Sequence, residues 1–550
     1  MKRHVEGLIR QALSAAVAAG ELGAQEPPAF AVEVPGDPRF GDLSTNAALV
    51  LARAEGRPPH AIARLLAGHL EAAAPGGWLK GPPEVAGPGF INIRLAPAFW
   101  QLMLAEALAA GEAYGRSAAG AGRRAQVEFL SANPTGPLTV GHGRNAVIGD
   151  TLARLLVATG WRVEREYYFN NAGRQMKVLA ESVRARYLEL IGGPAGFPED
   201  GYRGDYVRDI ARGLVERHGA ALARDDGAAF RAAAEQSIFA AIRATQERLG
   251  IAFDHYFNED SLYRSGAIER TLAALEARGL VERREGAVWL RGAAVGLEQD
   301  RVLVKSSGEP AYRLPDIAYH LDKLARGFDA VIDVLGADHI AEHQEVAAAL
   351  RALGADAARI RPVIYQFVTL TRHGEQVKMS TRRAEYVTLD ELLDEVGVDA
   401  GRFFFLMRKS DSHLEFDLDL AKQQSTDNPV FYVQYAYARI ASVLRQAAES
   451  GIPLAAEPDL SPLGDPEVEV VRAVASYPDV VETAARDLEP HRVVFHALDL
   501  AGAFHRYYNR QRILTEDRAL TQARLALVRA VQQVLRGALG LAGVTAPERM

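Results

Sequence analysis

The sequence contains no cysteine among its 550 residues, which excludes disulfides, thiolate zinc sites and a cysteine nucleophile. It has no apolar run of membrane-spanning length, and no apolar signal-peptide core follows the opening residues Met1–Glu6. We therefore expect a cytoplasmic protein that does not enter a membrane. The net charge of −7 argues against a general nucleic-acid binder, although it leaves room for a local basic surface.

The stretch from Gln126 to Asp150 has the pattern of a phosphate-binding turn. An apolar run at Val127–Leu130 predicts a strand, and apolar residues recur at helical spacing after the turn Gly141-His142-Gly143. In open α/β sheets such a turn lets a phosphate approach backbone N–H groups at the start of the helix. A turn of this kind often only connects two elements, but this one contains an imidazole. In addition, Glu128 lies at the end of the predicted strand, where side chains face the ligand crevice.

A second stretch, far along the chain, indicates a family. Val377–Arg383, with the sequence VKMSTRR, resembles the KMSKS loop of class I aminoacyl-tRNA synthetases, and Thr139–His142, TVGH, resembles their HIGH motif. The resemblance extends from about Phe40 to the carboxyl terminus. Further segments resemble those of arginyl-tRNA synthetases, in the same order along the chain: Ser131–Pro137, Tyr312, Asp316–His320, Gly336–His339 and Asp427–Tyr435.

The resemblance implies an α/β fold of several domains, in agreement with the length and the ordinary globular composition. A Rossmann-type parallel-sheet catalytic domain is expected at residues 125–398, with a helical connective insertion at 192–292. An α+β N-terminal domain that contacts tRNA is expected at 1–110, and an all-α anticodon-binding domain at 399–550, where strand signals vanish. Short, mostly apolar runs predict the parallel strands: Val127–Leu130, Trp161–Phe169, Arg301–Val304, Ala330–Leu335 and Val363–Val368.

The resemblance also implies a site for ATP, which would enter as its Mg²⁺ complex. We expect no tightly bound cofactor and no metal held by the protein itself. The chemistry requires positioning and charge stabilisation rather than a protein nucleophile. The resemblance assigns ATP binding to Gly141, His142, Gly143, Lys378, Met379 and Ser380, and catalysis to His142, Thr139, Lys378 and Arg382.

Two positions depart from the family motifs. Thr139 stands where HIGH begins with histidine, and Thr381 stands at the second lysine of KMSKS. A hydroxyl donates a hydrogen bond but carries no charge, and one lost donor costs roughly 3 kcal/mol at a transition state. Either Arg382 or Arg383 would supply the missing cation of the loop. Some arginyl enzymes without that lysine carry one before the HIGH motif, and the matching position here is Gly136.

The predicted amino-acid pocket contains two carboxylates. The resemblance assigns arginine binding to Glu128, Asn133, Tyr312, Asp316 and His339. Asp316 alone would more often cap a helix. Two acids in one pocket, however, fit a cationic substrate better than two coincident caps do.

A third set of residues is predicted to contact tRNA(Arg). Arg439, Arg506 and Arg510 lie among tyrosines, a combination suited to phosphates and unstacked bases. Such a helical stretch is usually a solvated face, and only its place in a domain that resembles an anticodon-binding bundle favours RNA. We expect a monomer.

The leading hypothesis is an arginine–tRNA ligase that uses L-arginine, ATP and tRNA(Arg). One alternative is a catalytically weakened, tRNA-binding paralogue, suggested by Thr139 and Thr381. Another is a class I synthetase for a different amino acid. The acids at Glu128 and Asp316 oppose an apolar substrate, and the absence of cysteine opposes the zinc-bearing members.

Overall fold

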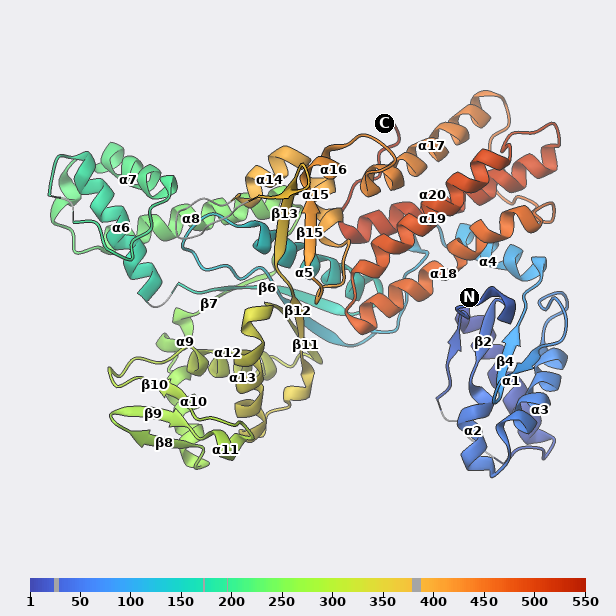
Figure 1. Ribbon diagram of the computed structural model, residues 1–550, viewed down its shortest axis with the longest axis horizontal. Helices are drawn as coiled ribbons and strands as arrows, with labels where there is room; N and C mark the ends of the chain where they lie inside the picture. Colours follow the sequence, from blue (N-terminus) through green and yellow to red (C-terminus); the bar gives the residue numbers. More distant parts are fainter. Residues whose placement is uncertain (24–28, 172–173, 195, 378–386) are drawn as a thin grey trace.

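A five-stranded parallel sheet, of order β12-β11-β5-β6-β7, lies at the centre of the molecule (Figure 1). The computed structural model describes residues 1–23, 29–171, 174–194, 196–377 and 387–550. The sheet confirms the predicted Rossmann-type class. Its strands are β5 (Arg124–Glu128), β6 (Arg162–Phe169), β7 (His255–Asn258), β11 (Ala330–Gly336) and β12 (Ile360–Tyr365).

Helices cover both faces of the sheet, as the apolar strands require. On one face lies α5 (Val140–Ala158), where Phe129 is so close to Gly149 that a Cβ there would lie 2.2 Å from its ring. On the other face lies α12 (Arg313–Ala325), whose Lys323 bonds Glu128. Phe129 and Glu128 point in opposite directions because side chains alternate along extended backbone. The helix α13 (Ile340–Ala352) connects β11 to β12 and packs on α12.

The segment between β6 and β11 is mostly helical, and its helices α6 and α7 reach far from the sheet (Figure 1). Two expectations for this region are wrong. β7 lies inside the predicted insertion yet extends the main sheet beside β6. The run at Arg301–Val304 is an antiparallel strand, β10, in the separate sheet β10-β9-β8. A run of four residues, three of them apolar, does not distinguish a parallel strand from an antiparallel one. The elements are α6 (Arg174–Leu190), α7 (Asp205–His218), α8 (Ala228–Arg248), α9 (Asp260–Arg264), α10 (Ala267–Ala277), β8 (Val281–Arg284), β9 (Ala287–Leu290), α11 (Gly292–Val295) and β10 (Arg301–Val304).

A small three-stranded sheet, of order β14-β13-β15, follows the main sheet. The predicted strand at Val363–Val368 is divided between β12 and β13 by Gln366 and Phe367. No strand was expected after about Asp399, so β15 is a further correction; it consists of only four residues, and pairing with β13 holds it. The elements are β13 (Val368–Arg372), β14 (Glu375–Gln376), α14 (Leu389–Val396), α15 (Val398–Phe405), β15 (Leu414–Asp417) and α16 (Leu418–Lys422).

The chain begins with an α+β domain, as predicted. Its four-stranded antiparallel sheet has the order β1-β2-β4-β3. After it, α4 packs on α18 and α20 of the C-terminal half. The elements are α1 (Lys2–Ala18), β1 (Val32–Glu33), β2 (Leu43–Thr45), α2 (Ala47–Glu55), α3 (Pro59–Ala73), β3 (Glu84–Ala86), β4 (Phe90–Ile93) and α4 (Pro97–Ala110).

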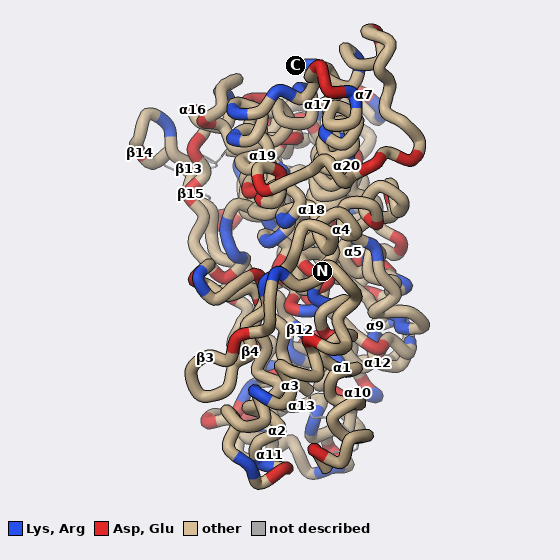
Figure 2. The backbone as a smooth tube through the Cα atoms, turned by 90° about the vertical axis from the view of Figure 1, so that its right-hand side faces the viewer, with Lys and Arg blue, Asp and Glu red and all other residues tan. Residues whose placement is uncertain are grey.

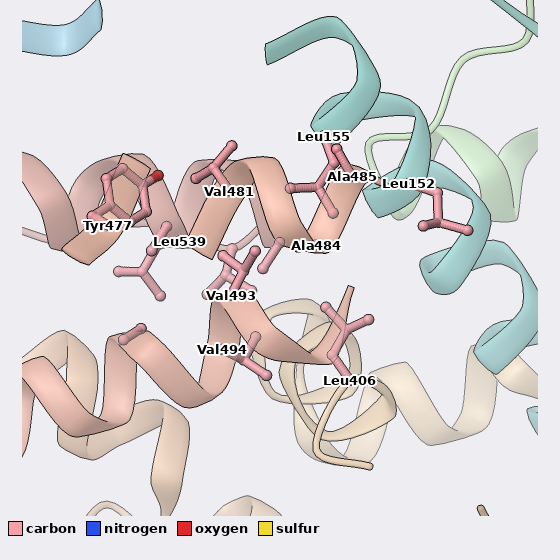
Figure 3. Close-up of a cluster of buried hydrophobic side chains, with 14 of the residues drawn as sticks. Leu152, Leu155, Leu406, Tyr477, Val481, Ala484, Ala485, Val493, Val494 and Leu539 are labelled. Carbon is pink, nitrogen blue, oxygen red and sulfur yellow. The ribbon is translucent and has the colours of Figure 1, made fainter. Parts of the chain in front are cut away.

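Four long helices complete the chain: α17 (Pro429–Glu449), α18 (Asp465–Asp487), α19 (His491–Arg510) and α20 (Arg518–Ala542). An apolar cluster joins them to the catalytic part (Figure 3). Leu152 and Leu155 of α5 lie in it with Val481 and Ala485 of α18. Among the described helices, only α20 has the length and mean hydropathy of a possible membrane span, although the sequence led us to expect no such run. In the structure 67% of that window is buried, as in the core helix of a bundle.

Candidate active site

His142 lies in the first turn of α5, where it is held as a neutral hydrogen-bond donor. The predicted glycine-rich turn Gly141-His142-Gly143 is thus helical, and Thr139 marks the start of the helix. The backbone N–H of Thr139 donates to His142 Nδ1 at 3.0 Å, so Nδ1 has no proton and Nε2 carries it. Burial lowers the pKa of His142 to about 4, which keeps the ring uncharged at neutral pH. The remaining Nε2–H can therefore donate to a phosphate or ribose oxygen, but the ring cannot serve as a cation.

Thr139 has a local partner of its own. Its Oγ1 lies 3.2 Å from the same His142 nitrogen, and the residue caps the start of α5. The backbone of Thr139 also forms a β-bridge with Thr388, and Leu389 N–H donates to Leu138 O at 2.8 Å. The turn is thus tied to the chain that directly follows residues 378–386.

The second motif itself falls largely outside the described residues. This applies to Lys378, Met379, Ser380 and Arg382, and their predicted roles stay predictions. On the amino-terminal side of the motif, Val377 N–H donates to Leu370 O in the β13–β14 hairpin. On the carboxyl-terminal side, Thr388 lies at the turn.

The two glycines of the turn have different surroundings. A Cβ at Gly143 would lie 2.5 Å from Leu389 and 3.0 Å from the Phe405 ring, so close packing of α14 and α15 on α5 requires a glycine there. A Cβ at Gly141 would meet nothing nearer than Thr139 Oγ1, at 3.8 Å. Gly141 is therefore the glycine with open space for a ligand.

Glu128 lies at the carboxyl end of β5 and is held by the loop that follows. Ser131 Oγ donates to Glu128 Oε1 at 2.9 Å and accepts from Tyr168 N–H at 3.1 Å. Leu130 and Ser131 have φ values of 68° and 34°, a backbone conformation that residues other than glycine rarely adopt. Such strain is often found at functional sites, and here it directs the serine hydroxyl at the carboxylate.

Asp316 lies in the first turn of α12, close enough to Glu128 for their charges to interact. Burial raises its pKa to about 6, and the negative charges of Glu342 and Glu128 act in the same direction. Burial likewise raises the pKa of Glu259 to about 7, with Asp316 among its charged neighbours. All three acids, Glu128, Asp316 and Glu259, raise the pKa of Tyr168 in addition to its burial. The structure therefore places these acids close enough to interact, in an acidic cluster beside Tyr168.

The other predicted pocket residues lie nearer the surface. The side chain of Tyr312 is 69% exposed, and Asn133 is exposed in the loop after β5. His339 is 56% exposed; its Nδ1 lies 3.5 Å from Glu342 and its Nε2 lies 3.7 Å from Asp338. These carboxylates raise the pKa of His339. In this structure, then, Glu128 and Asp316 are close enough for their charges to interact, whereas Tyr312, Asn133 and His339 are exposed.

Sequence reasoning missed several residues of the site. Glu128 bonds the ammonium of Lys323, which is fully buried and also lies 2.7 Å from Asp333. Neither partner was predicted, and Glu259 was not predicted either. Polar residues recur along one face of α12, and this spacing could have indicated that the helix faces other polar groups. Which strand residues they meet depends on the register of the strands, and one sequence does not predict that register.

The predicted tRNA contacts lie on α17 and α19. Arg439 lies 4.7 Å from the ring centres of both Tyr435 and Tyr508 and donates to Tyr435 OH at 2.8 Å. Arg506 is paired with Glu469 at 2.6 Å, and Arg510 is exposed. Over the face seen in Figure 2, basic and acidic residues are interspersed rather than separated. Of the predicted basic residues, Arg439 thus has the most ordered aromatic setting.

A separate cavity lies away from these residues. It has a volume of about 580 Å³ and lies beside Arg154 of α5, roughly 20 Å along the helix from Thr139 at 1.5 Å per residue. Five arginines line it, but four already have partners: Arg154 and Arg165 face Asp150, Arg529 bonds Gln532 and Arg536 pairs with Glu112. We therefore assign the chemistry to the turn and the acidic cluster.

Comparison with known proteins identifies the family. Three family models match: the arginyl-tRNA synthetase N-terminal domain at residues 3–95, the class I (R) tRNA synthetase catalytic domain at 103–411, and the DALR anticodon-binding domain at 433–550. Two similar proteins are the arginine–tRNA ligases of Desulfotalea psychrophila, 52% identical over 95% of both chains, and of Salinibacter ruber, 48% identical over 94% of this chain and 95% of that protein. The structure of Thermus thermophilus arginyl-tRNA synthetase matches over the whole of both chains, with a TM-score of 0.77 and 26% identity. The predicted resemblance is confirmed, and the chain belongs to the arginyl-tRNA synthetase family of class I aminoacyl-tRNA synthetases.

Proposed function

We propose that the protein is an arginine–tRNA ligase: it activates L-arginine with ATP and transfers it to tRNA(Arg), releasing AMP and pyrophosphate. One observation supports the choice of substrate above the others. Two carboxylates, Glu128 and Asp316, lie close enough to interact at the carboxyl edge of a parallel sheet, and the helix start suited to phosphate follows the same strand. An arginine guanidinium supplies the positive charge that such a pair lacks.

We assign roles to individual residues on the same basis. His142 donates through Nε2–H to ATP, and Gly141 leaves space for the phosphates; Gly143 and Thr139 hold this turn in place. Lys378, Met379, Ser380 and Arg382 cover the pyrophosphate, with Mg²⁺ bound to the nucleotide. Glu128 and Asp316 bind the guanidinium, while Asn133, Tyr312 and His339 close the pocket rim when the substrate is present.

We further propose that four regions divide the work: 1–110 and 399–550 contact tRNA, 125–398 performs the chemistry, and 192–292, apart from the sheet strand β7, is an insertion within it. Arg439, Arg506 and Arg510 would meet the anticodon end of tRNA. The protein would act as a monomer in the cytoplasm, without a membrane and without a tightly bound cofactor.

The catalytically weakened paralogue receives no support. Relatives close to half identical over nearly the whole chain are named ligases, and Thr139 forms an ordered cap rather than a gap in the turn. The test is aminoacylation of a tRNA mixture with each of the common amino acids in turn. Arginine alone should be charged. Charging of another amino acid, or AMP release with no amino acid charged, would contradict the proposal.

A further inference from the structure

Three carboxylates lie side by side on one face of the central sheet. Asp333 of β11 is paired in register with Glu128 of β5, and Glu128 is paired with Glu166 of β6. Paired residues on neighbouring strands point to the same face. The side chains of Asp333 and Glu166 are 3% and 0% exposed. Like charges placed side by side and away from water destabilise a fold unless cations accompany them.

One face of α12 supplies these cations at intervals of three residues. Lys323 bonds both Glu128 and Asp333. Arg326, at the end of the helix, donates to both oxygens of Glu166, with Nη2 at 2.9 Å from Oε1. His320 Nε2 lies 3.0 Å from Asp333 Oδ2. Each carboxylate of the row therefore faces a basic group from the same helix.

His320 links this row to Asp316. Its Nδ1 lies 2.8 Å from the backbone oxygen of Asp316, which can only accept a hydrogen bond. Its Nε2 faces an ionised carboxylate, because Lys323 and His320 hold the pKa of Asp333 far below its usual value despite its burial. Both ring nitrogens must then donate, so His320 is an imidazolium cation. A chain of hydrogen bonds thus runs from Glu128 through Lys323, Asp333 and His320 to the backbone oxygen of Asp316.

The bases of this chain leave negative charge unbalanced. Lys323 and His320 match Glu128 and Asp333 in number, whereas Arg326 is shared by Glu166, Glu164 and Asp322. Asp316 adds a negative charge beside them, and Glu259 adds more as the pH rises through its raised pKa of about 7. The acidic cluster therefore keeps excess negative charge for a cationic substrate.

We propose that Lys323 and His320 are positioning residues for substrate selection. Lys323 fixes the Glu128 carboxylate in direction, and His320 holds both Asp333, the second partner of Lys323, and the backbone of Asp316. This inference rests on the proposed function. Acceptors fixed in direction distinguish a planar guanidinium with five donors from the ammonium of lysine, which a mobile carboxylate would also accept.

The same neighbourhood has the spacing of a metal site. Ligand atoms of His320, Asp333 and His343 lie within 4.8 Å of one another. The other oxygen of Asp333 already bonds the buried ammonium of Lys323, however, and a divalent ion would stand next to that charge. We therefore assign these residues to the hydrogen-bonded chain rather than to a metal.

The test compares four variants of the full-length protein: Lys323→Met, His320→Gln, Lys323→Arg and the control Arg326→Met. The control disturbs the same carboxylate row through the same helix, but its partners are Glu166, Glu164 and Asp322 rather than Glu128 or Asp316. The measurements are kcat and KM for charging with arginine and with lysine, KM for ATP, Tm, and the divalent metal content of the purified protein.

Lys323→Met and His320→Gln should each reduce the preference for arginine over lysine by roughly tenfold or more, mainly through KM for arginine. KM for ATP should stay unchanged, and Lys323→Arg should recover much of the preference. Arg326→Met should lower Tm while changing the preference by less than about threefold.

Four results would overturn the inference. An unchanged preference in both Lys323→Met and His320→Gln would reduce these residues to a structural role. An equal loss in Arg326→Met would do the same, and stoichiometric metal lost in either variant would replace the chain by a metal site. If Lys323→Met does not fold, His320→Gln still decides, because it keeps the bonds of Lys323. If the unmodified protein does not charge arginine, both the proposed function and this inference fail. If it does charge arginine and only the variants behave otherwise than expected, the inference alone fails.

Discussion

At the scale of single residues, the pocket should respond to pH through Asp316. Its raised pKa of about 6 means that the folded protein holds a proton there that the unfolded chain has already lost. Between its ordinary pKa and about 6, this group therefore lowers the stability of the fold as the pH rises. Guanidinium binding, by contrast, needs the ionised form and should release a proton in the same range.

The prediction is that arginine affinity weakens about tenfold per pH unit below pH 6 and is constant just above it. Calorimetric titration with arginine, with tRNA present, in two buffers of different ionisation enthalpy would measure the released proton. Asp316→Asn should remove the release near pH 6, whereas Glu259→Gln should keep it. Proton release near pH 6 that persists in Asp316→Asn would assign it to another group.

His142 should act through its proton on Nε2 and not through charge, because burial keeps its pKa near 4. His142→Ala should lower the rate of adenylate formation by roughly 10²- to 10³-fold, the effect of one donor lost at a transition state. The unmodified enzyme should show no ionisation of this ring between pH 5 and 8 in single-turnover measurements. A loss of less than about threefold in His142→Ala would return the ring to a purely structural capping role.

At the scale of secondary-structure elements, the two glycines of the turn should separate packing from ligand binding. Gly143→Ala places a Cβ against Leu389 and Phe405 and should destabilise the fold by about 1–3 kcal/mol. Gly141→Ala meets only Thr139 Oγ1 at an ordinary distance, so it should leave stability nearly unchanged and instead raise KM for ATP. Urea denaturation and ATP kinetics would show both effects. Equal stability of the two variants would contradict the packing described for α5, α14 and α15.

The elements also show what one sequence can and cannot predict. Long periodic segments such as α17 and α20 and the buried strands β6 and β11 follow from hydrophobic spacing. The short run at Arg301–Val304 was placed in the wrong sheet because it pairs with β9 across an intervening segment. Among site residues, Glu128 and Asp316 were predicted from motifs, but Lys323 was not. Its role depends on the register that sets Glu128 beside Asp333, and register is set by tertiary structure.

At the scale of the whole molecule, the C-terminal helices are part of the fold as well as a surface for tRNA. Leu152 and Leu155 of α5 are buried against α18 (Figure 3), so deletion of the helices would expose an apolar face of the catalytic part. Loss of charging after such a deletion would therefore not identify an RNA contact. Single substitutions on the surface of α17 and α19 are the better test.

Arg439→Ala and Arg510→Ala should weaken tRNA binding without lowering Tm. If each removes one phosphate contact, the slope of log affinity against log salt should become shallower by about 0.7 to 0.9. The matched control is Arg486→Ala, an exposed arginine roughly 25 Å along α18, at 1.5 Å per residue, from Glu469, the partner of Arg506. Affinity equal to that of the control in both variants would leave these arginines as an ordinary solvated face.

The central claim is that two carboxylates select arginine, and the most direct measurement is kcat/KM for arginine in Glu128→Gln and Asp316→Asn. Each change removes a charge at nearly constant volume. A substrate cation buried without its partner costs roughly 3–5 kcal/mol, which corresponds to about two to four decades in kcat/KM. The account predicts that loss in both variants, with KM for ATP unchanged. Near-normal charging with arginine by both variants would contradict it.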